Sequence, residues 1–132
     1  MNFRILAAAL GIALLAAPAA AENWRASSAG MGAIAYIDVD SIQRSGEQVT
    51  FWREVRWPEV KTFEDGTSYD RIAALYEADC NAMTLRSLHL RVSLGGEVIG
   101  SVEDTGEVEQ ATPGSTAETD LRSACFGEWP QG

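Results

Sequence analysis

The chain has two cysteines, Cys80 and Cys125, which lie 45 residues apart. In an oxidising compartment they would form one disulfide, and the chain-entropy model gives a closure of this length a stabilisation of roughly 4 kcal/mol. A redox role would instead need a C-x-x-C spacing or a lone exposed thiol. We therefore expect a structural disulfide that ties a middle segment of the chain to its C-terminal end.

Residues 1–21 have the three regions of a cleavable signal peptide. Arg4 supplies the positive start, an apolar run extends from Ile5 to Ala17, and three alanines precede Glu22. The run is shorter than the ~20 residues that a membrane-spanning helix needs. We expect an exported protein with a signal peptide at 1–21 and a single mature domain at 22–132. Because no cysteine stands at the cleavage point, we expect no lipid or membrane anchor after cleavage.

The net charge of the chain limits the classes of partner that it can bind. The formal net charge is −9 and becomes −10 when Arg4 is removed with the signal peptide. A chain of this charge repels nucleic acid and anionic lipid surfaces, so we expect neither as a partner. Acidity also keeps an exported protein soluble, which is its simplest explanation.

Alternating apolar and polar residues predict a small antiparallel sheet of about five to six strands. The expected strands cover residues 33–39, 48–57, 68–80, 84–94 and 97–103. Residues 22–31 are small and polar apart from Trp24, and are expected to be a loosely ordered lead-in. Pro58 is expected to end the second of these strands because proline cannot donate a ladder hydrogen bond.

Two strands of this sheet form a predicted hairpin. Gly95 and Gly96 suit a two-residue turn that needs positive φ. The register that follows places Val92 opposite Ile99 and His89 opposite Val102.

A C-terminal helix is predicted from its boundary signals. Ser115 is the expected N-cap, Glu118 completes a capping box, and Gly127 supplies the stop. One stripe of the helix carries its small and apolar side chains, at Ala117, Leu121, Ala124 and Cys125. The predicted fold class is therefore α+β, with one packed C-terminal helix tied to the sheet by the disulfide.

The order of several residues resembles the surface-adhesin protein E family of exported bacterial proteins. The resemblance rests on Tyr36-Ile37-Asp38, Ser41-Ile42, Arg44, Gly46, Phe51-Trp52, Tyr69, Asp79-Cys80, Arg86, Pro113-Gly114-Ser115 and Cys125. It covers residues 36–126 and implies an antiparallel sheet covered by a C-terminal helix with one disulfide. It also implies a non-enzymatic envelope protein that attaches to host proteins and forms a homodimer.

Signals for catalysis or metal binding are weak. His89 and Ser87 would share a strand face about 7 Å apart, which is too far for a nucleophile and its base, and no third group is marked. With both cysteines in a disulfide, His89 alone remains for zinc. Asp38 and Asp40 are expected in a turn, and the acidic stretch at 103–109 on a solvated face, with a weak cation site as the alternative. We expect no enzyme, no catalytic residue, no cofactor and no metal site.

The expected function is a non-catalytic interaction module in the periplasm or outside the cell, with a host or envelope protein as partner. Candidate contact residues are Trp52, Arg53, Arg56 and Trp57, because exposed Trp and Arg favour protein recognition. The two tryptophans fall on opposite strand faces, and a core or helix-covered position is favoured for Trp52. The alternatives are an envelope accessory protein without a host ligand and a small-molecule-binding protein.

Overall fold

The computed structural model describes residues 22–103 and 105–130, so the predicted signal peptide lies outside the described residues. The described part contains one antiparallel sheet, one α-helix and one short 3-10 helix, η2 (Val39–Ser41). The strands are β1 (Trp24–Gly30), β2 (Ala33–Asp38), β3 (Gln43–Ser45), β4 (Gln48–Thr62), β5 (Ser68–Asp79), β6 (Thr84–Leu94), β7 (Glu97–Glu103) and β8 (Glu109–Gln110). The helix α2 spans Thr116–Phe126.

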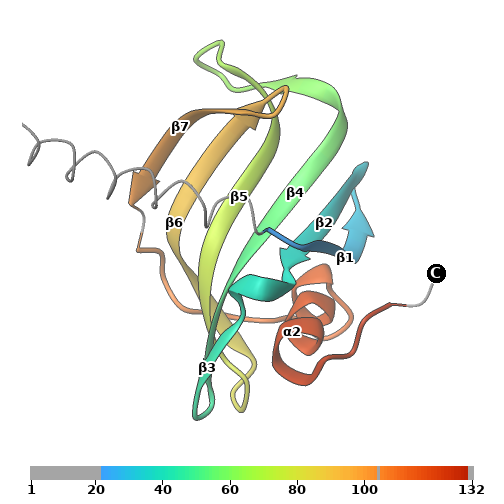
Figure 1. The fold of residues 1–132 in the computed structure, drawn as a ribbon, viewed down its shortest axis with the longest axis vertical. Helices are drawn as coiled ribbons and strands as arrows, with labels where there is room; N and C mark the ends of the chain where they lie inside the picture. The colour runs from blue at the N-terminus through green and yellow to red at the C-terminus, as the bar shows by residue number, and fades with distance from the viewer. Residues whose placement is uncertain (1–21, 104, 131–132) are drawn as a thin grey trace, which may run out of the picture.

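Six strands form the main path of the sheet, in the order β1-β2-β4-β5-β6-β7. Each pair is antiparallel, and the sheet curls as it passes from β1 to β7 (Figure 1). Two short strands, β3 and β8, pair with β4 and β6 outside this path. The predicted antiparallel sheet with one C-terminal helix is confirmed, but the eight strands exceed the five to six expected.

The helix packs at one end of the sheet, against β1 and β4 (Figure 1). Its buried residues meet the odd-numbered side chains of β4 in the main core cluster. Phe51, Ile37 and Leu121 are completely buried there and are its largest apolar members. At ~25 cal/mol per Å² of apolar surface, each stabilises the fold by about 2 kcal/mol.

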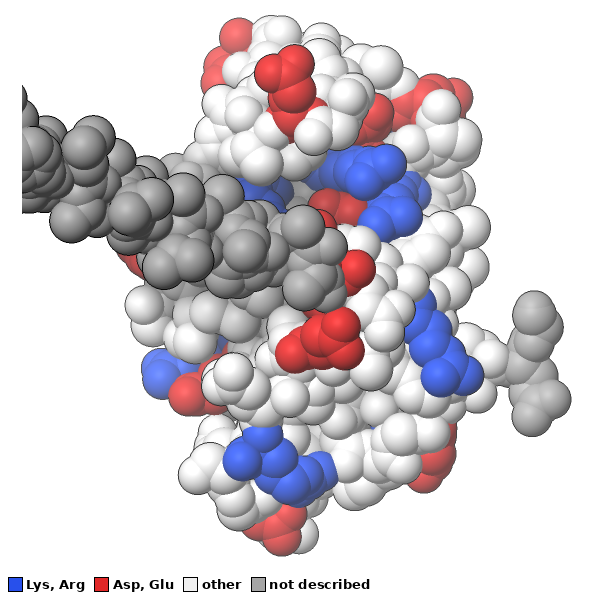
Figure 2. All heavy atoms as spheres, viewed as in Figure 1, with Lys and Arg blue, Asp and Glu red and all other residues white. Residues whose placement is uncertain are grey.

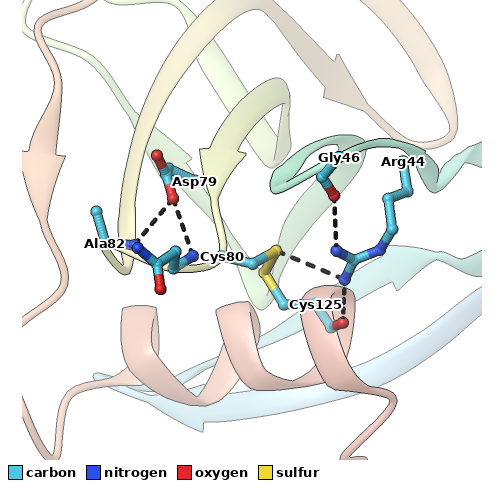
Figure 3. The surroundings of a disulfide bond; sticks show 7 residues. Arg44, Gly46, Asp79, Cys80, Ala82 and Cys125 are labelled. Atoms are coloured by element: carbon cyan, nitrogen blue, oxygen red, sulfur yellow. Dashed lines mark hydrogen bonds between the residues drawn. A yellow bond between two sulfur atoms is a disulfide. The ribbon is translucent and has the colours of Figure 1, made fainter.

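The disulfide between Cys80 and Cys125 is present, with the two Cα atoms 5.7 Å apart. It joins the residue after β5 to the last turn of α2 (Figure 3). Arg44 on β3 donates from Nη2 to the carbonyl of Cys125 and from Nη1 to the carbonyl of Gly46 at 3.1 Å. The guanidinium therefore satisfies a carbonyl at the C-terminal end of the helix, where cations are favoured.

Both ends of α2 follow the sequence signals. The Ser115 hydroxyl accepts from the Glu118 N–H at 3.3 Å, and Gly127 adopts a left-handed φ of 68°. The Glu118 carboxylate accepts from the Gly114 N–H, whereas a standard capping box would have used the N–H of Ser115. The helix boundaries are as predicted. Only the backbone donor to the Glu118 carboxylate differs, since it belongs to Gly114 and not to Ser115.

The expected loose lead-in at residues 22–31 is wrong, because β1 occupies Trp24–Gly30. After Trp24 and Arg25 it contains only Ala, Ser and Gly, so no apolar alternation marked it as a strand. Tertiary contacts stabilise it instead. Ser27 is fully buried and donates to Oδ1 of Asp120 on α2 at 2.6 Å.

The predicted strand end at Pro58 is also wrong, since β4 continues to Thr62. The ladder with β5 is interrupted between Arg56 and Lys61, and Pro58 lies in this interruption. An irregularity of this kind needs no N–H from proline, so the strand can continue through it.

The hairpin of β6 and β7 forms across Gly95-Gly96, but its predicted register is wrong by one residue. Val92 pairs with Gly100 and His89 with Glu103. An irregularity between Val92 and Ser93 adds one residue to β7, which is how a bulge shifts every later pair.

Candidate functional site

The two faces of the sheet carry different side chains. Odd-numbered residues of β4 point towards α2, as Val49 and Phe51 do in the core. Even-numbered residues of β4 point to the opposite face, which we call the open face. Its members come from β1, β2, β4, β5 and β6: Trp24, Tyr36, Trp52, Glu54, Arg56, Leu75, Arg71, His89, Arg91 and Ser93.

Glu54 is the buried acid at the centre of the open face. It is 5% exposed, and its Oε1 accepts from Nε of Arg56 at 2.7 Å and lies 3.6 Å from Nη1 of Arg71. Burying a carboxylate is costly unless it is paired, and here two guanidiniums share one carboxylate. Glu54 therefore fixes the positions of both arginines.

Two of the arginines of the open face also make cation–π contacts with aromatic rings. The Arg56 guanidinium lies 4.1 Å from the ring centroid of Tyr36 and 5.6 Å from that of Trp24. Arg91 lies 4.6 Å from the ring of Trp52. Cation–π contacts of this kind contribute about 0.5–2 kcal/mol each and orient the cation.

Trp52 is half-buried on the open face, so the favoured core or helix-covered position is wrong. Its ring meets His89 edge-on, with centroids 5.7 Å apart. His89 Nδ1 lies 3.0 Å from both carboxylate oxygens of Glu103 on β7. Aromatic and charged groups thus continue across the open face from β4 to β7.

The other two candidate contact residues lie on the helix side. Arg53 pairs with Asp120 of α2 through Nε at 2.6 Å. Trp57 meets Tyr69 edge-on at 5.6 Å. The four residues therefore do not form one patch, although Arg56 and Trp57 both line an apolar hollow of about 460 Å³ beside β2.

Ser87 and His89 were expected on one strand face, and this expectation is wrong. An irregularity at Leu88 places Ser87 opposite Tyr76 and His89 opposite Leu75. Because Tyr76 packs against the core and Leu75 does not, the two polar side chains point to opposite sides of the sheet.

The acidic turn after β2 has a local structural role. Oδ1 of Asp38 accepts from the N–H groups of Asn23 and Asp40, which begins η2. Among residues 22–103 and 105–130, no three Asp, Glu, His or Cys side chains are grouped so that they could hold a metal ion. Within the same ranges, no helix has the length and apolar content to cross a membrane.

Sequence reasoning missed most of the open face. Arg71 and Arg91 lie on strands that were predicted correctly, but alternation alone does not show that they lie beside Glu54 and Trp52. Trp24 and Tyr36 needed the pairing of β1 with β2, which no local pattern indicated. The missing signal was therefore the order of the strands.

The charges on the surface are mixed. Figure 2 shows basic side chains in small groups, most of them beside acidic ones, on the face turned to the viewer. A continuous basic field of the kind that tracks a nucleic-acid backbone is not seen on that face.

Comparison with known proteins gives one family. The family model for surface-adhesin protein E matches residues 24–126. No curated protein matches the chain.

Solved structures of Haemophilus influenzae protein E share the fold. Its crystal form II superposes with a TM-score of 0.57 at 15% identity, covering 77% of this chain and 94% of that one. A second structure gives 0.56 at 14% identity over 80% and 92%. Protein E from non-typeable Haemophilus influenzae gives 0.53 at 14% identity over 79% and 84%. With the family model spanning most of the chain, this protein belongs to the surface-adhesin protein E family.

Proposed function

We propose that this domain is a non-catalytic exported module that binds a protein partner through the open face of its sheet. The observation that carries the proposal is the set of arginines held against aromatic rings, in which Arg56 lies over Tyr36 and Arg91 over Trp52. Trp, Tyr and Arg are the residue types that dominate binding energy at protein interfaces.

Pre-organisation supports the same function. A free arginine side chain loses rotamer entropy when it is fixed at an interface. Here Arg56 is already held by a 2.7 Å bond to the buried carboxylate of Glu54 and by two rings. A partner that binds this surface therefore loses less entropy in ordering it.

The family match supports a surface-adhesin role, and the fold is that of protein E. A host or envelope protein is accordingly the partner that we propose. Trp57 contributes at the margin of the surface, where it shares the hollow beside β2 with Arg56.

The test is capture of partners by the oxidised, processed protein from host extracellular material and from envelope fractions. Trp52→Ala and Arg56→Ala should each reduce capture at least about fivefold, as expected for an interface residue worth 1 kcal/mol or more. Arg122→Ala is the matched control, because Arg122 is exposed on α2 and pairs only with Glu128 among the described residues.

The proposal fails if capture is equal for all variants that retain the native circular dichroism spectrum. Capture of envelope proteins alone would reassign the module to an accessory role in the envelope.

A further inference from the structure

A hollow of about 240 Å³ opens on the open face between β1, β5 and β6. Its polar lining is supplied by Glu22, Glu54, Arg71, Arg91 and Ser93, with Trp24 at one side. It is a few side chains wide, which suits one residue of a partner and not a whole domain.

The hollow is lined by two arginines, Arg71 and Arg91, and by two acids, Glu54 and Glu22. Arg56 also binds Glu54 from beside the hollow, so positive charge exceeds negative charge once the Glu22 carboxylate is displaced. The described ion pairs use one nitrogen of each guanidinium, namely Nε of Arg56, Nη1 of Arg71 and Nη2 of Arg91. An arginine has five N–H donors in a planar fork, so these side chains have donors left to bind a further carboxylate.

Glu22 shows the type of group that this hollow accepts. Its Oε2 lies 3.7 Å from Nη2 of Arg91, and its Oε1 accepts from the indole N–H of Trp24 at 3.2 Å. The side chain of Glu22 is 40% exposed and its distance to Arg91 is longer than a hydrogen bond, so the contact is weak. A partner carboxylate that comes closer to Arg91 can therefore replace the carboxylate of Glu22.

We infer that the partner of the open face presents an acidic segment, with one carboxylate bound between Arg71 and Arg91 in place of Glu22. This inference rests on the proposed function and adds the chemistry of the partner. The long-range repulsion from a chain with net charge −9 disfavours extended polyanions, whereas a short acidic peptide meets only the local positive charge. Trp24 and the ring of Trp52, which Arg91 contacts, favour apolar residues beside that carboxylate.

The experiment measures fluorescence anisotropy of three labelled peptides with the oxidised, processed protein at low and physiological salt. The peptides alternate phenylalanine with glutamate, glutamine or lysine. We expect the glutamate peptide to bind most tightly and the lysine peptide most weakly, with the difference decreasing as salt rises. Arg71→Gln and Arg91→Gln should each weaken the glutamate peptide about tenfold and leave the glutamine peptide unchanged. Arg122→Gln is the control for a general change in charge.

Glu22→Gln provides a gain-of-binding test that misfolding cannot imitate. Removing the internal carboxylate should strengthen binding of the glutamate peptide severalfold and leave the glutamine peptide unchanged. Equal binding of all three peptides, or a sulfated oligosaccharide binding where the glutamate peptide does not, would overturn the inference. A third outcome separates the two proposals. If Trp52→Ala loses partner capture but the unmutated protein shows no preference for the glutamate peptide, the proposed function stands and only this inference is rejected.

Discussion

Arg53 on β4 and Asp120 on α2 are joined by an ion pair with 2.6 Å between Nε and Oδ2. The Asp120 side chain is 2% exposed, and its second oxygen accepts from the buried Ser27 hydroxyl of β1. One carboxylate thus connects the helix to two strands. It also explains why a charged residue, Arg53, stands on the apolar side of β4.

Replacing Asp120 with alanine should destabilise the domain by about 2–3 kcal/mol. The change leaves the buried Ser27 hydroxyl and the guanidinium of Arg53 without their acceptor. The expected loss of stability is smaller than for a fully buried ion pair, because the Arg53 side chain is 19% exposed. Urea unfolding followed by tryptophan fluorescence would measure it, with Arg122→Ala as the exposed control. A loss below about 0.5 kcal/mol would show that this pair does not hold the helix to the sheet.

Removal of the disulfide should have a larger effect. The model that attributes disulfide stabilisation to chain entropy gives about 4 kcal/mol for a separation of 45 residues. A Cys80→Ala and Cys125→Ala double variant should therefore unfold at much lower urea concentration than the oxidised protein. The reduced wild-type protein is the matched control, since it lacks the bond but retains both sulfur atoms. An unchanged midpoint in both would contradict the prediction.

The N-cap of α2 gives a smaller and more local prediction. Ser115→Ala removes the acceptor of the Glu118 N–H and should cost about 1 kcal/mol. Ser115→Asp keeps an acceptor at the same place and should retain most of the stability. Thermal unfolding of the three proteins would decide this, because equal stability of the alanine and aspartate variants would mean that the cap bond contributes nothing.

These contacts show how far the sequence alone could predict the structure. The ends of α2 and the bounds of β6 and β7 depend on neighbouring residues, and local patterns predicted them. The disulfide was predicted because the sequence offers a single pair of cysteines. β1 was missed because Ser27 is buried by a partner 93 residues away. The β6–β7 register was missed because a bulge changes pairing without changing residue type.

The candidate site was predicted less completely for the same reason. Trp52 and Arg56 were identified from residue type, and the structure places both on the open face. Arg71 and Arg91 lie 17 and 37 positions after Glu54 in the sequence, and only the order of the strands brings them beside it. Polar networks across a sheet depend on such pairings, which periodicity does not specify.

The tip of the hairpin between β4 and β5 should respond to acid. Oδ1 of Asp65 accepts from the Thr67 N–H at 2.9 Å, and the backbone and side chain of Thr67 lower the pKa of this carboxyl below its ordinary 3.8. Because the folded-state pKa is the lower one, the ionised carboxylate stabilises the turn above pH 3.8, and this contribution is lost as the pH falls through the folded-state value. An NMR titration of the Asp65 carboxyl carbon should give a midpoint below 3.8, with a shift of the Thr67 amide proton at the same pH. In the Asp65→Asn variant the amide shift should disappear. A carboxyl midpoint at or above 3.8 would mean that the Thr67 bond does not persist in solution.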